Sequence, residues 1–125
     1  MIIGMGIDIV EVERISGIMN RHAEAFTRRV FTPSEIALAA ERRNDLLFFA
    51  GRWAAKEAAA KALGSGFGGD CSPQDFELTS GPGGAPKLEC RGAARELWKR
   101  RGCGRWNVSI SHERHYAVAV VILEK

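Results

Sequence analysis

The sequence predicts an α+β domain, in which one strand is followed by helices and then by further strands. Three observations lead to this prediction. The N-terminal run is apolar and alternates between two faces, the middle of the chain is rich in alanine, and the C-terminal segment is rich in β-branched side chains. This order along the chain separates the helices from most of the strands, as α+β proteins do.

The length and composition suit a single domain over residues 1–125. A chain of this length buries roughly two-thirds of the surface that its unfolded form exposes. Hydrophobic residues make up 46% of the chain and charged residues 26%, which argues against a disordered or a fibrous protein. No internal repeat is visible, so one core is expected.

The first expected elements are a strand and two helices. In the strand over residues 1–12, Ile7 and Ile9 share one face and Asp8 lies on the other. Residues 11–31 predict a helix with a weak point at 17–20. A second helix is expected over 32–43, because Thr32 can cap it, Pro33 fits its first turn and Glu35 completes a capping box.

A longer, alanine-rich helix is expected over residues 45–63, ended by Gly64. Gly64, Gly66 and Gly69 match the letters of the dinucleotide-binding G-x-G-x-x-G motif. That motif requires a helix after the glycines, whereas here they follow the end of one. A helix cap and loop is therefore expected, with the alternative that its backbone also lines a ligand site.

The remainder of the chain predicts short strands and one helix. Strands are expected at 75–80 and 86–90, a helix at 91–102, and an antiparallel pair at 105–112 and 115–124. The helix predictions and strand predictions together complete the α+β order.

Charge and cysteine usage indicate an anionic partner and a reducing compartment. The net charge is only +3, but residues 91–105 carry six basic side chains against one acid. Cys71, Cys90 and Cys103 are widely spaced and odd in number, so reduced thiols and a cytoplasmic location are expected. The N-terminal run is interrupted by Asp8, unlike a signal peptide, and no segment has the length of a membrane span.

Two carboxylates stand out as candidates for chemistry. Asp8 lies between apolar residues on a partly buried strand, where its charge must be compensated; a turn or capping acid is the alternative. On the alanine-rich helix Trp53, Glu57 and Lys61 form one stripe, with Arg52 and Lys56 beside it. The stripe could be a solvated face with a Glu57–Lys61 pair. Two carboxylates with lysines also suit Mg²⁺ bound to phosphates.

Histidines near the C-terminus add a weaker signal. His112 and His115 flank the turn of the last strand pair, and His22 is the other histidine in the chain. A zinc site is not expected, because no cysteine lies at ligand spacing. His112 is either a surface residue or a donor to a phosphate.

These stretches resemble the 4'-phosphopantetheinyl transferase family, specifically its small bacterial holo-[acyl carrier protein] synthases. The first motif of the family is present as GIDIVEVERI at residues 6–15 and the second as RWAAKEAAAKALGSG at 52–66. The third region resembles GAPKLE at 84–89 followed by NVSISHERHYAVAVVI at 107–122. Trp53 stands where many relatives have phenylalanine. The resemblance implies the family fold, an antiparallel sheet packed with helices that include one long central helix.

The resemblance also implies an activity and roles for the residues already singled out. The phosphopantetheine arm of coenzyme A would pass to a serine of apo-acyl carrier protein in fatty acid biosynthesis, releasing adenosine 3',5'-bisphosphate. Either Glu57 or a water molecule at the metal would take the serine proton. The implied metal ligands, for Mg²⁺, are Asp8 and Glu57. The implied catalytic residues are Asp8, Glu57 and Lys61, and the implied coenzyme A contacts are Arg52, Lys56, Lys61 and His112.

Docking of the carrier protein is expected on the first helix. Arg14, Arg21 and Arg28 recur every seven residues and align along one side if the helix is continuous. Acyl carrier proteins are acidic, and the family resemblance assigns docking to this region; solvated arginines are the alternative. Met19 and Phe26 either supply an apolar anchor beside them or pack in the core.

The resemblance further implies a homotrimer with active sites between neighbouring subunits. Two other functions stay open on the residues alone. One is a Mg²⁺-dependent hydrolase of nucleoside pyrophosphates, which would also use two carboxylates to bind Mg²⁺ beside phosphates. The other is a small basic module that binds nucleic acid through residues 91–105, although the chain has a single tyrosine and no interleaving of exposed aromatic and basic residues.

Overall fold

The computed structural model describes residues 1–69 and 71–125 and confirms the α+β order. The α-helices in this part of the chain are α1 (Val12–Val30), α2 (Pro33–Ala40), α3 (Asp45–Leu63) and α4 (Gly92–Arg100). Its strands are β1 (Ile2–Glu11), β2 (Phe76–Ser80), β3 (Pro86–Cys90), β4 (Arg105–His112) and β5 (Tyr116–Glu124). Two short 3₁₀ turns are η1 (Pro73–Asp75) and η2 (Pro82–Gly84).

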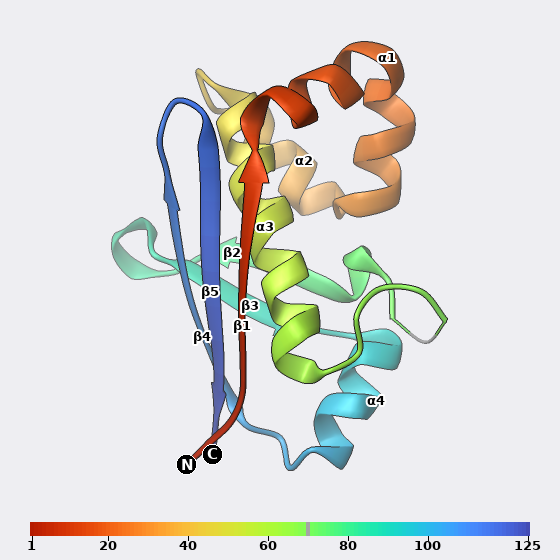
Figure 1. Ribbon diagram of the computed structural model, residues 1–125, viewed down its shortest axis with the longest axis vertical. Helices are drawn as coiled ribbons and strands as arrows, with labels where there is room; N and C mark the ends of the chain where they lie inside the picture. Colours follow the sequence, from red (N-terminus) through yellow and green to blue (C-terminus); the bar gives the residue numbers. More distant parts are fainter. Residues whose placement is uncertain (70) are drawn as a thin grey trace.

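The strands form two antiparallel sheets. One has the order β1-β5-β4, and the other is the hairpin of β2 and β3. Figure 1 shows α3 running along the three-stranded sheet, with α1 and α2 at one end of it and α4 at the other. The chain ends meet, since the amino group of Met1 donates to the carbonyl of Lys125 at 2.6 Å. The first strand, β1, is thus paired with the last strand, β5.

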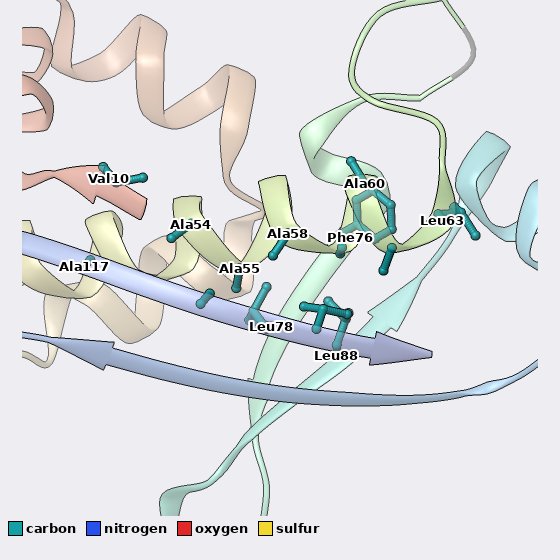
Figure 2. Packing of buried hydrophobic residues seen from close by; sticks show 14 of the residues in the cluster. Val10, Ala54, Ala55, Ala58, Ala60, Leu63, Phe76, Leu78, Leu88 and Ala117 are labelled. Atoms are coloured by element: carbon teal, nitrogen blue, oxygen red, sulfur yellow. The ribbon is translucent and has the colours of Figure 1, made fainter. Parts of the chain in front are cut away.

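Helix α3 approaches β1 closely because the facing surfaces of both elements carry small residues, glycine on the strand and alanine on the helix. A Cβ atom added at Gly6 would lie 2.0 Å from the carbonyl oxygen of Ala58, and one at Gly4 would lie 2.0 Å from that of Ala62. The buried side of α3 is mostly alanine, as Figure 2 shows for Ala54, Ala55, Ala58 and Ala60. Only glycine on the strand permits this contact, which places the side chains of β1 directly beside those of α3.

The predicted start of α2 and both predicted ends of α3 are confirmed, whereas α2 ends at Ala40, three residues before its predicted end. Thr32 and Glu35 form the capping box at the start of α2. Gly64 ends α3 with φ of 82°, in the left-handed region that favours glycine.

The weak point of α1 lies two residues beyond the predicted range. His22, with φ −143° and ψ 42°, interrupts the helix, rather than a residue within 17–20. The interruption lets the second half of α1 turn so that the ring of Phe26 packs edge-on against Phe31 at 5.8 Å and Trp53 at 6.0 Å. Tertiary packing therefore decides the position of the break.

Within residues 1–69 and 71–125, no helix combines the length and the apolar character needed to cross a membrane.

Candidate functional site

A hollow lined by described residues of β1, α1 and α3 brings together the two candidate carboxylates. It has a volume of about 550 Å³ and lies between the end of β1, the start of α1, the middle of α3 and Tyr116 at the start of β5. Its polar wall consists of Asp8, Glu11, Arg14, Glu57 and Lys61. Its apolar wall includes Ile15, Ile18, Phe26 and Trp53. We call this hollow the acidic cavity.

Asp8 reaches the acidic cavity because of its position on β1. Alternate residues of the strand face α3, and the neighbouring Gly6 lets the helix approach. The side chain of Asp8 is only 17% exposed. Its charge is compensated by Lys61, whose ammonium donates to Asp8 Oδ1 at 3.1 Å and to the carbonyl of Ile7 at 2.9 Å. Lys61 thus bridges to the strand instead of pairing with Glu57 along the helix.

Glu57 faces the same cavity in an unfavourable setting for a charge. Its pKa is raised, first by burial and then by the negative charge of Asp8, against the lowering influence of Lys61 and Arg14. Two carboxylates that repel each other across an open cavity are a setting in which a bound cation is stabilising. The arrangement fits Asp8 and Glu57 as oxygen ligands of one divalent ion.

The donor set suits Mg²⁺ in particular. Among the described residues, no group of three or more His, Cys, Asp or Glu side chains is placed to hold a metal. Mg²⁺ is usually held by one or two carboxylates, with water and phosphate oxygens filling the other positions. Two carboxylates beside a lysine therefore fit a magnesium ion that carries a phosphate ligand.

Arg52 and His112 line a different hollow, of about 220 Å³, at the other side of α3. The pKa of Arg52 is lowered, first by burial and then by the charge of Arg42. Its guanidinium carbon lies 4.2 Å from the ring centre of Phe48, and its Nε has no partner among the described residues. Arg43 also lines this hollow. This basic pocket, as we call it, gathers three guanidinium groups where an anion would be stabilised.

Arg42 and Arg43 were missed in the sequence. The signal was present, because a pair of arginines stands at the end of the second predicted helix, in the run ERRN. In one chain the basic pocket and the acidic cavity are separate, so Arg52 and His112 do not meet Asp8 and Glu57 there.

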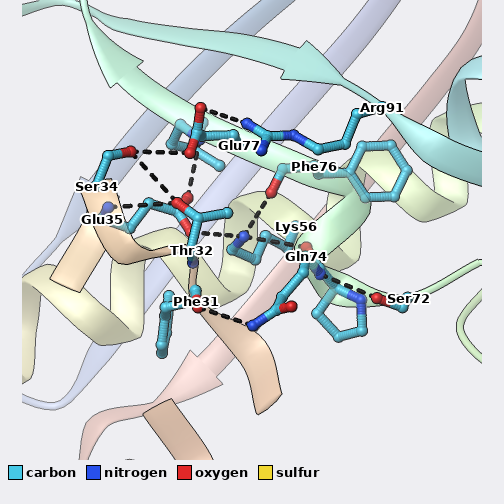
Figure 3. Close-up of polar contacts among 12 residues, drawn as sticks. Phe31, Thr32, Ser34, Glu35, Lys56, Ser72, Gln74, Phe76, Glu77 and Arg91 are labelled. Carbon is cyan, nitrogen blue, oxygen red and sulfur yellow. Dashed lines mark hydrogen bonds and ion pairs between the residues drawn. The ribbon is translucent and has the colours of Figure 1, made fainter. Parts of the chain in front are cut away.

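Lys56 does not face a ligand, and its expected contact with coenzyme A is corrected. Its side chain has no exposed surface, and its ammonium pairs with Glu35 at 2.8 Å and donates to the carbonyls of Pro73 and Phe76 (Figure 3). The physical reason is helix geometry: Lys56 precedes Glu57 by one residue, or about 100° around the helix. That rotation directs Lys56 into the protein.

The three arginines of the expected docking stripe are not aligned on one continuous helix. Arg14 lines the acidic cavity, but the break at His22 separates it from Arg28, which pairs with Glu24 at 2.6 Å on the surface. Phe26 lies in the apolar wall beside Arg14 and also packs against Phe31 and Trp53, so it contributes to the core, and its role as an anchor stays a prediction. Ile18, which the sequence analysis missed, adds to that wall.

The basic stretch 91–105 does not form one uniform surface. Arg91 pairs with Glu77 at 2.5 Å, and Arg105 pairs with Glu124 at 2.6 Å. Acids from outside the stretch therefore offset part of its charge.

The chain is similar in sequence to known proteins. A family model described as the 4'-phosphopantetheinyl transferase superfamily matches residues 4–121. A holo-[acyl-carrier-protein] synthase of Nitratidesulfovibrio vulgaris is 45% identical over 124 residues, 99% of each chain.

Two crystal structures have the same fold. The holo-[acyl-carrier-protein] synthase of Neisseria meningitidis has a TM-score of 0.92 and 33% identity, with 100% of both chains covered. That of Bacillus anthracis, in complex with CoA (3',5'-ADP), has a TM-score of 0.83 and 35% identity, covering 100% of this chain and 98% of the other. The similarity in sequence and fold extends over nearly the whole chain.

Proposed function

The chain belongs to the 4'-phosphopantetheinyl transferase superfamily, and from this premise we propose that it is a holo-[acyl-carrier-protein] synthase. It transfers the 4'-phosphopantetheine moiety of coenzyme A to a serine of apo-acyl carrier protein, giving holo-acyl carrier protein and adenosine 3',5'-bisphosphate. The observation that carries the proposal is the meeting of Asp8, Glu57 and Lys61 in one cavity.

The reaction makes one bond and breaks another. The serine oxygen bonds to the phosphorus that carries the pantetheine arm, and the serine proton passes to Glu57 or to a water molecule. The P–O bond to the nucleotide phosphate breaks, and adenosine 3',5'-bisphosphate leaves. Such a transfer depends on alignment and on neutralisation of charge more than on covalent help from the protein.

The residues of the acidic cavity provide that neutralisation and alignment. Asp8 and Glu57 would hold Mg²⁺, which would supply positive charge against the phosphate oxygens. Lys61, held in place by its hydrogen bond to the Ile7 carbonyl, directs its ammonium into the same space. Its charge opposes the negative charge that grows on the phosphate under attack.

The basic pocket is proposed as the place for the nucleotide end of coenzyme A. Arg52 and His112 contact its phosphates there, with Arg42 and Arg43 adding positive charge. The basic pocket and the acidic cavity are separate in one chain. We therefore infer that two neighbouring subunits form each complete site, one supplying the acidic cavity and the other the basic pocket.

An uncovered apolar face supports the proposed homotrimer. Met5, Ile7 and Ile9 of β1 are more than 60% exposed, on the side of the sheet away from α3. Their antiparallel partners Ile122, Val120 and Val118 share that face. Six adjacent apolar side chains on one sheet face are typical of a surface buried by assembly.

The docking site for the carrier protein is proposed at the acidic cavity. Arg14, which lines this cavity, and Arg21, further along α1, offer positive charge to an acidic helix. The apolar wall beside Arg14 offers an anchor for the apolar residues of that helix. The reaction is placed in the cytoplasm, in fatty acid biosynthesis, and the free state of Cys71, Cys90 and Cys103 fits that compartment.

Mass spectrometry tests the proposal directly. The protein is incubated with coenzyme A, Mg²⁺ and an apo-acyl carrier protein, and the carrier is expected to gain the mass of the phosphopantetheine arm. Formation of a nucleotide product without modification of the carrier would indicate a hydrolase instead. Salt-sensitive binding of nucleic acid with neither product would indicate a binding module.

A further inference from the structure

A buried ion pair lies beside the proposed catalytic residues, and the transfer reaction leaves it without a role. Glu35 on α2 and Lys56 on α3 have no exposed side-chain surface and lie 2.8 Å apart. The ammonium of Lys56 also donates to the carbonyls of Pro73 and Phe76, so each of its three protons has an acceptor. Figure 3 shows these bonds converging on Lys56 from separate segments of the chain.

Glu35 is held as firmly as Lys56. Its Oε1 accepts from the amide of Thr32 at 2.8 Å, and its Oε2 accepts from the amide of Leu78 at 2.8 Å. The pair therefore ties α3 to the start of α2, to η1 and to β2. These bonds are directional, and a small displacement of α3 would break several of them together.

Helix α3 needs such directional contacts because its main packing surface is smooth. It meets β1 through alanine side chains and strand glycines, as at Ala58 and Gly6. Small side chains interlock less than large ones. The contact between α3 and β1 therefore fixes the distance between the two elements, but it restrains the rotation of α3 about its own axis only weakly. A buried, fully bonded ammonium restricts that rotation.

We propose that Glu35 and Lys56 are positioning residues for the transfer reaction. The pair fixes the rotation and height of α3, so that Glu57 and Lys61 face Asp8 on β1. Lys56 directly precedes Glu57, and a slip of one residue would turn the helix by about 100° and shift it by about 1.5 Å. This inference rests on the proposed function, because it assigns the pair to the geometry of that site.

Two substitutions and their combination test the proposal. Lys56→Met keeps the length of the side chain and removes the charge, Glu35→Gln weakens the pair, and the double variant removes both charges, which a buried site tolerates better than the loss of one. Leu88→Ala is the control, since it opens a cavity in the core on β3, away from the acidic cavity. Thermal unfolding of all variants ranks their stability.

The readouts separate positioning from stability. At a temperature where every variant is folded, the double variant is expected to lose at least about tenfold in kcat, because small misplacements of catalytic groups are costly. Its KM for the carrier should stay near that of the wild type, since α1 does the docking. Its affinity for Mn²⁺, measured by electron paramagnetic resonance without substrate, should fall several-fold. Leu88→Ala should lose stability and keep kcat and Mn²⁺ affinity.

Clear results would overturn the proposal. A folded double variant with the kcat and Mn²⁺ affinity of the wild type would show that the pair does not position the site. Failure of all three variants to fold would assign the pair to folding alone. If the wild type itself leaves the carrier unmodified, the proposed function fails, whereas the Mn²⁺ comparison still decides whether the pair positions the carboxylates.

Discussion

Asp8 and Glu57 are two carboxylates whose environments differ. Asp8 is compensated by the ammonium of Lys61, whereas the pKa of Glu57 is raised by burial and by Asp8. A raised pKa means that the ionised side chain is less stable in the folded protein than in water. At the residue scale, the ionised carboxylate of Glu57 therefore destabilises the folded protein, and a bound cation would offset this effect. Such a conflict between function and stability is expected at a functional site.

Asp8→Ala is expected to reduce the transfer rate and leave the fold intact. The loss should be on the order of a hundredfold or more, as for other groups that stabilise charge in a transition state. Stability should change by less than about 1 kcal/mol, because the half-exposed ammonium of Lys61 becomes solvated. Steady-state rates and thermal unfolding measure both effects. Near-normal rates at limiting Mg²⁺ would rule out Asp8 as a metal ligand.

Glu57→Gln is expected to abolish transfer and to stabilise the protein without divalent ions. Since the folded-state pKa of Glu57 is raised, the wild type loses stability as the pH rises from the ordinary glutamate pKa through the raised value. The variant lacks this pH dependence of the free energy of unfolding. The two proteins should therefore have similar stability at low pH, and the variant should be the more stable one at neutral pH. Thermal unfolding in EDTA across this range measures the difference. A variant less stable than the wild type at neutral pH would contradict the assignment.

At the scale of elements, the contact between α3 and β1 creates the site. The helix carries Glu57 and Lys61, the strand carries Asp8, and Gly6 and Ala58 set the distance between them. The approach depends on the absence of a Cβ atom at Gly6 and also at Gly4.

Gly6→Ala should lower both stability and activity. The new Cβ would lie 2.0 Å from the carbonyl of Ala58, so α3 must move away from the strand. Overpacking of this kind costs roughly 1–3 kcal/mol. Thermal unfolding and transfer rates measure the effect.

Gly17→Ala is the matched control for Gly6→Ala. It places its Cβ within an ordinary 3.6 Å contact of the Arg21 guanidinium inside α1, and it should raise stability by up to about 1 kcal/mol. Equal effects of the two substitutions would contradict the proposed role of Gly6.

For the whole molecule, the proposed function predicts that a complete site depends on assembly. The acidic cavity and the basic pocket lie apart in one chain, and the apolar face of β1 and β5 is uncovered. Burial of that face between copies would favour association. The trimer remains a prediction.

Ile7→Lys is expected to dissociate the assembly without unfolding the subunit. The side chain of Ile7 is 62% exposed in the single chain, so the fold itself tolerates a lysine there. Light scattering should give the mass of one chain, and transfer activity should fall with dissociation. Thr79→Lys, a charge added on the separate hairpin of β2 and β3, provides a comparison. An Ile7→Lys variant with the mass of the wild type would exclude this face as the interface.

Mixing two inactive variants tests whether sites are shared between subunits. Asp8→Ala and His112→Ala chains, unfolded together and refolded at equal concentration, should recover about one intact site in four by random assembly. Each variant treated alone should stay inactive. Absence of recovery in mixed assemblies of confirmed composition would place each site within one chain.

Local sequence patterns predicted much of the fold. The capping box of Thr32 and Glu35 and the stop at Gly64 were read correctly, because each depends on neighbouring residues alone. The predicted position of the break in α1 was wrong, because the packing of Phe26 against Trp53 decides where the helix is interrupted. Arg42 and Arg43 were missed because their relation to Arg52 arises only when α2 and α3 pack together.

The sequence by itself determined the order of the elements, the family motifs and the types of side chain available for a phosphate reaction. Only the tertiary structure distinguished Lys56 from Lys61. The two lysines lie on the same helix about 140° apart around its axis. Packing against β1 leaves Lys61 beside Asp8, whereas packing against α2 and β2 buries Lys56 with Glu35. The role of each lysine is decided by the surface that its side of the helix meets.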